Sequence, residues 1–222
     1  MNGKVYSPKK DSYEGEYLAG EKHGKGKEYK YKGELIDFEG EYYFGKKKKG
    51  IEYDYKGKIE FEGEYLEDEK WKGKKYENGK LIFDGEFNKG ENWTGKIKKY
   101  DYNGKLEFEG NYLYGKEHGY GKQYHNQKLR YEGEYYYGFK WKGKYYDYFK
   151  EEIEEEYEYL YGEINGKVIE YFKGGKIRFE GEYLNGEKWK GKGYNPNGEL
   201  VYEINNGKKT GQEYDFNGVL IR

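Results

Sequence analysis

The segment Phe61-Glu62-Gly63-Glu64-Tyr65 decides the fold, because close copies of it recur along the chain. Seven clear copies begin with an aromatic residue, carry Gly at the third position, and start at residues 13, 38, 61, 83, 108, 131 and 179. Self-similarity at a period of about 20 to 50 residues is the signature of a repeat architecture. We therefore expect a repeat protein rather than a domain built around one thick core.

Two further copies are less regular. The segment 153–157 carries Glu155 in place of Gly, and the segment 200–204 carries Tyr202 there. The unit starts then lie at 13, 38, 61, 83, 108, 131, 153, 179 and 200, and the first six steps repeat the triplet 25, 23 and 22. This spacing indicates duplication of a three-unit block. We predict an array of nine hairpin units over residues 13–222, preceded by a lead-in strand or cap over residues 1–12.

Within a unit, apolar and charged residues alternate with a period of two. Leu106, Phe108, Gly110 and Tyr112 fall on one face of a strand, and Lys105, Glu107, Glu109 and Asn111 fall on the other. Such alternation predicts a strand with one covered face and one solvated face. The central Gly leaves a gap in the aromatic stripe, and we expect a ring from the neighbouring strand to fill it.

Each unit also carries two turn signals. One follows the stripe, as in Ala19-Gly20 or Asn185-Gly186, and the other precedes the next stripe. The second signal reads Asn78-Gly79, Asn103-Gly104 and Asn197-Gly198. Asn-Gly is a strong hairpin signal because both residues tolerate positive φ. The sequence therefore predicts an all-β protein: an elongated, single-layer, twisted antiparallel sheet of consecutive hairpins with about 18 strands.

Composition narrows the function classes. Charged residues reach 38%, but aromatic residues reach 21% with 32 Tyr, which is too many for a disordered chain. The chain has no Cys, so disulfides, a thiolate nucleophile and the usual zinc clusters are excluded. The net charge is -1 and the only arginines are Arg130, Arg178 and Arg222, which argues against a nucleic-acid partner.

Catalytic constellations are missing from the sequence. Serine and threonine are nearly absent, so a Ser nucleophile has almost no candidates. His23 and His118 occupy the same slot in two repeats, which favours a structural role over a metal site. Paired carboxylates such as Glu62 and Glu64 belong to a solvated strand face rather than to a closed cleft. We expect no enzymatic activity, no cofactor and no metal.

The segment Tyr13-Glu14-Gly15-Glu16-Tyr17, followed by Gly20 and by His23-Gly24-Lys25-Gly26, resembles the MORN (membrane occupation and recognition nexus) repeat family. A second such copy runs from Phe108 to Gly121, and the resemblance spans about residues 13–216. Several units depart from the family by replacing the His-Gly turn with Trp-x-Gly, which predicts a longer or bulged turn. The resemblance implies one extended antiparallel sheet with a groove, and scaffold proteins that dimerise and bind partner proteins, commonly at membranes or the cytoskeleton.

The favoured function is an interaction scaffold that holds a peptide or an amphipathic helix of a partner protein in an aromatic groove. The predicted contacts are the stripe and tryptophan rings: Tyr42, Tyr65, Trp71, Phe87, Trp93, Tyr112, Tyr135, Trp141, Tyr183 and Trp189. One alternative is peripheral binding to anionic phospholipids through Lys46, Lys47, Lys48 and Lys49. Another is an antitoxin-like, immunity-like or carbohydrate-binding role, in which the rings stack on sugars.

Two further expectations concern location and assembly. Residues 1–10 contain no apolar signal region and no run of about 18 apolar residues exists, so we predict a cytoplasmic protein, peripheral at a membrane or the cytoskeleton. Unpaired strands at the two ends, near Tyr13 and over Val219–Ile221, would offer edges for a homodimer.

Overall fold

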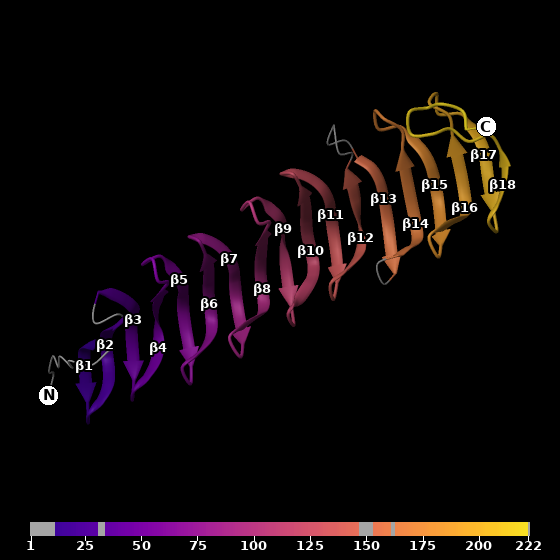
Figure 1. Ribbon diagram of the computed structural model, residues 1–222. Helices are drawn as coiled ribbons and strands as arrows, with labels where there is room; N and C mark the ends of the chain where they lie inside the picture. The colour runs from indigo at the N-terminus through magenta and orange to yellow at the C-terminus, as the bar shows by residue number, and fades with distance from the viewer. Residues whose placement is uncertain (1–11, 31–33, 147–152, 161–162, 222) are drawn as a thin grey trace. The chain divides into compact units, whose positions relative to one another are not determined.

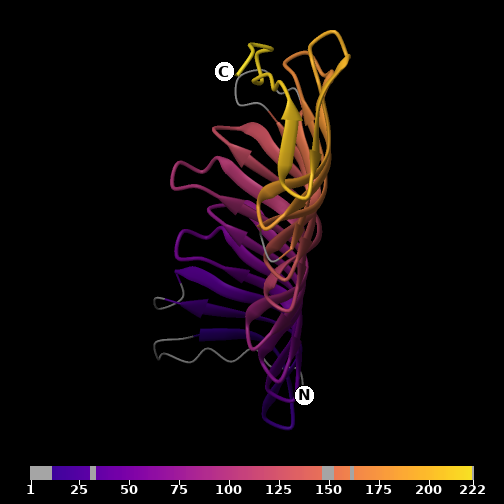
Figure 2. The same ribbon diagram turned by 90° about the vertical axis from the view of Figure 1, so that its right-hand side faces the viewer.

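A computed structural model describes residues 12–30, 34–146, 153–160 and 163–221 of the chain. The described residues form β-strands joined by turns and contain no helix. Figures 1 and 2 show the strands of each part as a single layer. The prediction of an all-β sheet of consecutive antiparallel hairpins is confirmed. Of the predicted lead-in, Ser12 is the first residue of β1, and the rest lies outside the described residues.

The chain divides into two compact units, Met1–Lys98 with Tyr112–Gly115, and Lys99–Asn111 with Lys116–Arg222. The strands that belong wholly or mostly to the first unit are β1 (Ser12–Leu18), β2 (Glu21–Lys30), β3 (Leu35–Tyr43), β4 (Lys46–Tyr53), β5 (Ile59–Leu66), β6 (Glu69–Glu77), β7 (Lys80–Asn88) and β8 (Glu91–Tyr100). From β1 to β8, each of these strands pairs antiparallel with the following one of the same group.

The second unit contains most of β9 (Leu106–Leu113) and then β10 (Lys116–His125), β11 (Lys128–Tyr136), β12 (Phe139–Tyr146), β13 (Ile153–Leu160), β14 (Glu163–Tyr171), β15 (Ile177–Leu184), β16 (Glu187–Tyr194), β17 (Leu200–Asn205) and β18 (Lys208–Gly211). From β10 onward each strand pairs antiparallel with the next.

Two glycines face each other across the centre of most repeats. Gly63 of β5 pairs with Gly73 of β6, and a Cβ on Gly63 would lie 2.2 Å from the carbonyl oxygen of Lys72. The tip of the Phe61 ring lies 2.7 Å from the same Cβ position and 2.8 Å from that of Gly73. The expectation that a neighbouring strand supplies the ring is thus wrong at Gly63. Its own strand supplies the ring, because residues i and i+2 share a face, and the ring then extends over the neighbouring Gly73.

Aromatic rings form the core of each unit. Phe38, Phe61 and Phe83 in the first unit are fully buried. The Phe61 centroid lies 5.4 Å from the Tyr65 ring of its own repeat and 5.3 Å from the Phe87 ring of the next, both edge to face. Edge-to-face contact is the favoured geometry for aromatic pairs. Each first-position ring therefore connects two repeats, which lets a single layer of strands bury apolar surface.

The strand register changes the start positions of the two less regular repeats. Ile59, two residues before Phe61, pairs with the last tyrosine of the preceding strand, and Ile153 and Leu200 have that same pairing. The positions equivalent to Phe61 are therefore Glu155 and Tyr202, not residues 153 and 200 as predicted. The step from 131 to 155 is then 24, so the triplet of steps does not repeat.

The physical reason is that a large side chain stands in the glycine position of both of these repeats. Tyr157 of β13 pairs with Gly143 and Ile204 of β17 pairs with Gly191, where most repeats place Gly opposite Gly. Matching Tyr157 to the fifth-position ring shifted the predicted unit by two residues. The ring in that fifth position is Tyr159, which is buried.

The turns within repeats follow the prediction, and two of the turns between repeats do not. Ala19 and Gly20 have φ of 53° and 88°, as a two-residue hairpin turn requires. At Asn103-Gly104 only the Gly has positive φ, at 74°. There the Asp101 carboxylate accepts the backbone N–H groups of Asn103 (2.9 Å) and Lys105 (2.7 Å), so an Asx turn fixes a longer loop. Before Asn197-Gly198, the side-chain oxygen of Asn195 accepts the equivalent two backbone N–H groups.

The predicted C-terminal edge strand is also corrected. The last strand is β18, and the chain then folds back, so that the Ile221 N–H donates to the Glu213 carbonyl at 2.8 Å. The Lys173 N–H donates to the Phe216 carbonyl at 3.2 Å, which ties this hook to a turn between repeats. Val219–Ile221 therefore lies in a closed hook and not in an edge strand.

Candidate interaction surface

The stripe rings that the sequence offers as partner contacts lie in the core. Tyr42, Tyr65, Phe87 and Tyr135 are between 3% and 8% exposed, and Tyr112 and Tyr183 are half-buried. Burial raises the pKa of Tyr42, Tyr65 and Tyr135 far above the usual range for tyrosine. These rings hold repeats together, and most of them present little surface to a partner.

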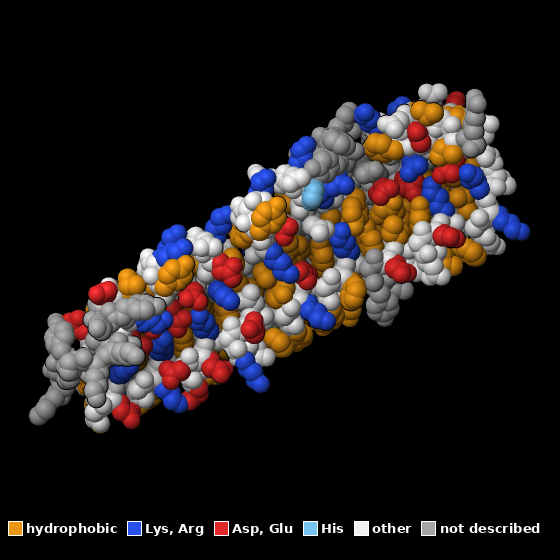
Figure 3. All heavy atoms as spheres, viewed as in Figure 1, with side chains coloured by type: hydrophobic (Ala, Val, Ile, Leu, Met, Phe, Trp, Pro, Cys, Tyr) orange, Lys and Arg blue, Asp and Glu red, His pale blue; other side chains and the backbone are white. Residues whose placement is uncertain are grey.

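Lysines cover the rings. The Nζ of Lys47 lies 4.5 Å from the Phe38 centroid, and that of Lys70 lies 5.1 Å from the Phe61 centroid, both within cation–π range. Both lysines also bind Glu52, at 3.2 Å and 2.8 Å. Burial opposes the charged form of Glu52, but the two lysines outweigh it and lower the pKa of this carboxyl. Figure 3 shows hydrophobic side chains interspersed with such lysines and carboxylates.

The four-lysine segment does not form one patch. Lys46 pairs with Glu67 at the hairpin turn, whereas Lys47 is turned inward over Phe38 and its side chain is only 19% exposed. Lys48 is the extra residue of a β-bulge and has no paired residue on β3. Lys49 lines a hollow, described below, on the opposite face of the sheet. Alternation along β4 therefore divides the charges that a lipid surface would need to meet together.

The tryptophans occupy β-bulges, as the Trp-x-Gly spacing predicts. Tyr65 pairs with Lys70 and Glu64 pairs with Lys72, so Trp71 is the extra residue. The same register holds at Trp93, Trp141 and Trp189. Trp71, Trp141 and Trp189 are 46%, 44% and 40% exposed, whereas Trp93 packs against Tyr114 with centroids 5.2 Å apart. Three of the four indoles are thus available at the surface.

These indoles belong to a larger apolar surface on the hairpin turns within repeats, at the lower edge of each unit in Figure 1. We call it the aromatic edge. In the first unit its exposed large side chains are Leu18, Tyr43, Phe44, Leu66, Trp71 and Tyr114. In the second unit they are Tyr136, Phe139, Trp141, Leu184 and Trp189. Several of these rings contact one another or a histidine of the same edge, as Tyr136 does Trp141 (5.8 Å) and Phe44 does His23 (5.2 Å).

The opposite edge, which carries the turns between repeats, exposes fewer aromatic rings. Its exposed large apolar residues are Tyr55 and Ile59 in the first unit and Tyr102, Ile177, Leu200 and the hook residues Val219, Leu220 and Ile221 in the second. Among the described residues no ring contact joins any of these side chains to another. The exposed rings of the turns are therefore concentrated on the aromatic edge.

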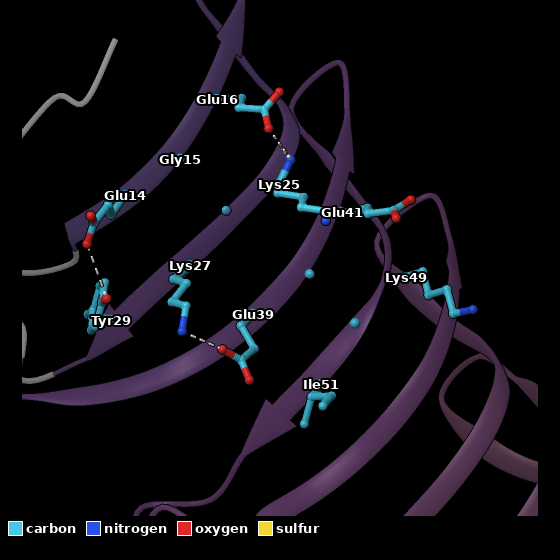
Figure 4. Close-up of a pocket in the computed structure, with 13 residues that line it drawn as sticks. Glu14, Gly15, Glu16, Lys25, Lys27, Tyr29, Glu39, Glu41, Lys49 and Ile51 are labelled. Carbon is cyan, nitrogen blue, oxygen red and sulfur yellow. Dashed lines mark hydrogen bonds and ion pairs between the residues drawn. The ribbon is translucent and has the colours of Figure 1, made fainter. Parts of the chain in front are cut away.

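The glycine pairs leave an open hollow of about 960 Å³ on the face opposite the rings of the first unit. Its floor is Gly15, Gly26, Gly40 and Gly50, and its walls are Glu14, Glu16, Lys25, Lys27, Tyr29, Glu39, Glu41, Lys49 and Ile51 (Figure 4). Hydrogen bonds from Lys27 and Tyr53 lower the pKa of Glu39. A general acid would need a raised pKa, so Glu39 is unsuited to that role.

Sequence reasoning missed one recurring contact on this face. A tyrosine at or next to the end of the second strand of a repeat donates its hydroxyl to the Glu that precedes the central stripe position, which is Gly in most repeats, as Tyr53 does to Glu39 at 2.5 Å. The same bond joins Tyr76 to Glu62, Tyr124 to Glu109, Tyr171 to Glu156 and Tyr194 to Glu180. The signal was in the sequence, since such a tyrosine follows each of these glutamates by 14 or 15 residues.

His23 and His118 lie in ring clusters of the aromatic edge, with centroids 5.2 Å from Phe44 and 4.8 Å from Tyr137. Within the described ranges, no group of three or more His, Asp or Glu side chains is arranged to hold a metal ion. That part of the chain also contains no helix long and apolar enough to cross a membrane.

Comparison with known proteins does not place the chain in a family. No family model matches it. No curated protein matches it either. The resemblance to MORN repeats stays a prediction that rests on the repeated motif.

Proposed function

We propose that the chain is a non-enzymatic, MORN-like repeat scaffold that binds a partner protein along its aromatic edge. The observation that carries this proposal is the concentration of exposed aromatic rings on the turns within repeats, in both units. Contiguous exposed apolar surface on a soluble protein commonly marks an interaction site. The function predicted from the sequence is kept, but the contact residues change from the buried stripe to the bulge tryptophans and the turns.

A protein partner fits the chemistry of this edge better than a lipid surface. Aromatic residues rimmed by charges of both signs are typical of protein interfaces. The edge has such a rim, since Lys46 pairs with Glu67 beside Leu66, and Asp68 accepts the Lys47 N–H. An anionic membrane would favour a one-sided cluster of lysines, and the lysines of β4 are divided between faces.

The tryptophans can supply much of the binding energy. A large aromatic side chain buries up to about 250 Å², so covering the exposed 46% of Trp71 removes roughly 100 Å² from water. At about 25 cal/mol per Å² this contributes roughly 2 to 3 kcal/mol before ordering costs. Trp141 and Trp189 are exposed to a similar extent. Alanine at any one of them should therefore weaken binding by about ten- to a hundredfold.

The test compares two sets of substitutions in the tagged full-length protein. The edge variant combines Trp71→Ala, Trp141→Ala and Trp189→Ala, and the control combines Tyr55→Ala and Tyr102→Ala on the opposite edge, where both rings are exposed. We expect a discrete protein retained from the host extract in high salt by the wild type and the control, and lost with the edge variant. Circular dichroism should show intact strands in all three.

Equal retention by all three proteins would refute the aromatic edge as the binding surface. Recovery of lipid alone, released by salt, would instead favour the electrostatic membrane reading. Recovery that is competed by free sugars would favour the carbohydrate reading.

A further inference from the structure

A row of exposed apolar side chains follows the aromatic edge of the first unit, one from each of three successive repeats. Leu18, Tyr43 and Leu66 are the last residues of β1, β3 and β5, and each pairs with the first residue of the strand that follows. They are 46%, 60% and 62% exposed. Because their register is the same, the three side chains leave the same face of the sheet at intervals of one repeat.

The interval along this row is set by hydrogen-bonded strands. One repeat contributes two strands about 4.8 Å apart, so equivalent residues recur about every 9.6 Å. Bonds between neighbouring repeats reach the turns themselves. The Gly45 N–H donates to the Lys22 carbonyl at 2.9 Å, and the Lys47 N–H donates to the Asp68 carboxylate at 2.7 Å. The turns are therefore held close to the strand spacing and do not splay apart.

Among the regular backbone conformations, polyproline II matches this interval best. It has three residues per turn and a rise of about 3.1 Å, so every third side chain returns to the same side after about 9.3 Å. An α-helix returns after seven residues and about 10.5 Å. A β-strand presents one face at about 6.8 Å or 13.6 Å. Across the two intervals of the row, polyproline II drifts by about 0.6 Å and the helix by about 1.8 Å.

The side chains of the edge suit such a segment. Polyproline II segments dock on aromatic surfaces and lose little conformational freedom, because they are extended before they bind. Their backbone carbonyls stay solvated and accept hydrogen bonds. Tyr43 and Trp71 are 60% and 46% exposed, so the hydroxyl of one and the indole N–H of the other are donors at the surface.

The charges on this edge select a cationic partner. The first four turns within repeats carry five carboxylates and two lysines over residues 18–21, 43–46, 66–69 and 88–91. Glu21, Glu69 and Glu91 are exposed and share one slot, the first residue of β2, β6 and β8. Lys46, one of the two lysines, is already paired with Glu67. A segment that carries lysine or arginine is therefore complementary to the edge.

We propose that the aromatic edge of the first unit binds a cationic, proline-rich segment in the polyproline II conformation. This inference rests on the proposed function and names the chemistry of the partner. A polyproline II helix has three ridges. One ridge packs on Leu18, Tyr43 and Leu66, and the next carries lysine or arginine to the carboxylates of Glu21 and Glu69, which pair with the two leucines across the turns.

The test measures the fluorescence anisotropy of labelled peptides titrated with the full-length protein. The probe is a peptide of four Pro-Pro-Lys repeats. Four Gly-Ser-Lys repeats keep the charges without the preformed conformation, and four Pro-Pro-Glu repeats reverse the charge. We expect saturable binding of the Pro-Pro-Lys peptide, binding of the Gly-Ser-Lys peptide weaker by about tenfold because it must be ordered, and none of the Pro-Pro-Glu peptide. Equal binding of the two lysine peptides would overturn the proposal, since charge alone would then decide.

Two pairs of substitutions locate the site. Tyr43→Ala with Leu66→Ala should weaken the Pro-Pro-Lys peptide by about tenfold. Glu21→Gln with Glu69→Gln, which keeps the apolar row, should weaken it and reduce the salt dependence of binding. The matched control is Tyr55→Ala with Ile59→Ala on the opposite edge, where both side chains are exposed, and it should bind like the wild type. Unchanged binding by both edge pairs, or equal loss in the control, would refute the site.

Failure of this inference can be told apart from failure of the proposed function. An amphipathic peptide with leucine and lysine at heptad spacing probes a helical partner. If it binds and the Pro-Pro-Lys peptide does not, the inference is overturned and the proposed function stands. The same holds if the tryptophan variant loses a host protein that the wild type retains, while no proline peptide binds.

Discussion

Replacing Gly63 with Ala should be among the most damaging single changes in the first unit. The new Cβ would lie 2.2 Å from the carbonyl oxygen of Lys72 and 2.7 Å from the Cα of Gly73, whereas ordinary contacts begin at 3.4 Å. Both obstacles are backbone atoms, so no side chain can turn away to relieve the overlap. Strands β5 and β6 must separate by about 1 Å where they pair, as the difference between these contact distances requires.

The cost follows from what that separation disturbs. Two neighbouring ladder hydrogen bonds weaken, at about 1 kcal/mol each, and the displaced Phe61 ring adds roughly 1 to 3 kcal/mol of overpacking. Alanine restricts the unfolded chain and returns only about 0.5 to 1 kcal/mol. The net loss is about 2 to 4 kcal/mol, a large fraction of the roughly 5 to 15 kcal/mol that stabilises an ordinary domain.

Urea unfolding, followed by circular dichroism and by tryptophan fluorescence, measures this loss. Gly79→Ala is the matched control, because Gly79 has open space around its Cβ position and a φ of 81°. It should lose only the cost of the left-handed conformation, about 1 to 2 kcal/mol. If Gly63→Ala is no more destabilising than Gly79→Ala, the close approach of the glycine pair does not limit the packing.

Three further outcomes are expected. Burial opposes the charged form of Glu213, but two lysine partners outweigh it and lower its pKa to about 2. The ionised Glu213 carboxylate therefore stabilises the folded protein fully above about pH 4.5, its usual pKa, and this stabilisation is lost as the pH falls toward 2. In Glu213→Gln, the urea midpoint of unfolding should therefore change less with pH across that range than in the wild type. Tyr53→Phe removes the hydroxyl that binds Glu39 and should cost about 1 kcal/mol, whereas Tyr55→Phe, at an exposed ring, should cost almost nothing in the same assay. A variant in which Phe replaces every tryptophan except Trp93 should emit at shorter wavelength and resist acrylamide quenching better than the wild type, because Trp93 is packed; an unchanged spectrum would contradict its placement.

The repeat and its strands were predictable because two local signals agree. The period-two stripe that contains Phe61 and the turn at Ala19-Gly20 both specify antiparallel hairpins, and each recurs in register with the other. The prediction failed where one signal was ambiguous. Tyr157 and Tyr159 are both aromatic and two residues apart, so either could be taken as the fifth-position ring. Only the pairing of Tyr157 with Gly143 separates them.

The candidate site was harder to predict, because a sequence pattern does not say which rings are covered. Tyr65 and Trp71 both read as ring positions, yet the first is 7% exposed and the second 46%. Tyr65 packs edge to face on two rings and lies under Lys47, whose Nζ is 5.8 Å from its centroid, whereas Trp71 is the extra residue of a bulge. In the linear sequence that lysine looks like one more solvated charge.

The contact between a first-position ring and the fifth-position ring of the next repeat is chemically asymmetric at some of the repeat boundaries. Where Phe38 meets Tyr65, and where Phe83 meets Tyr112, the ring on the N-terminal side of the boundary is wholly apolar and the ring on the C-terminal side carries a hydroxyl. A proteolytic cut between such repeats would thus leave two unlike ends. The N-terminal fragment would present a bare phenylalanine and tend to aggregate, whereas the C-terminal fragment would present a tyrosine that tolerates water.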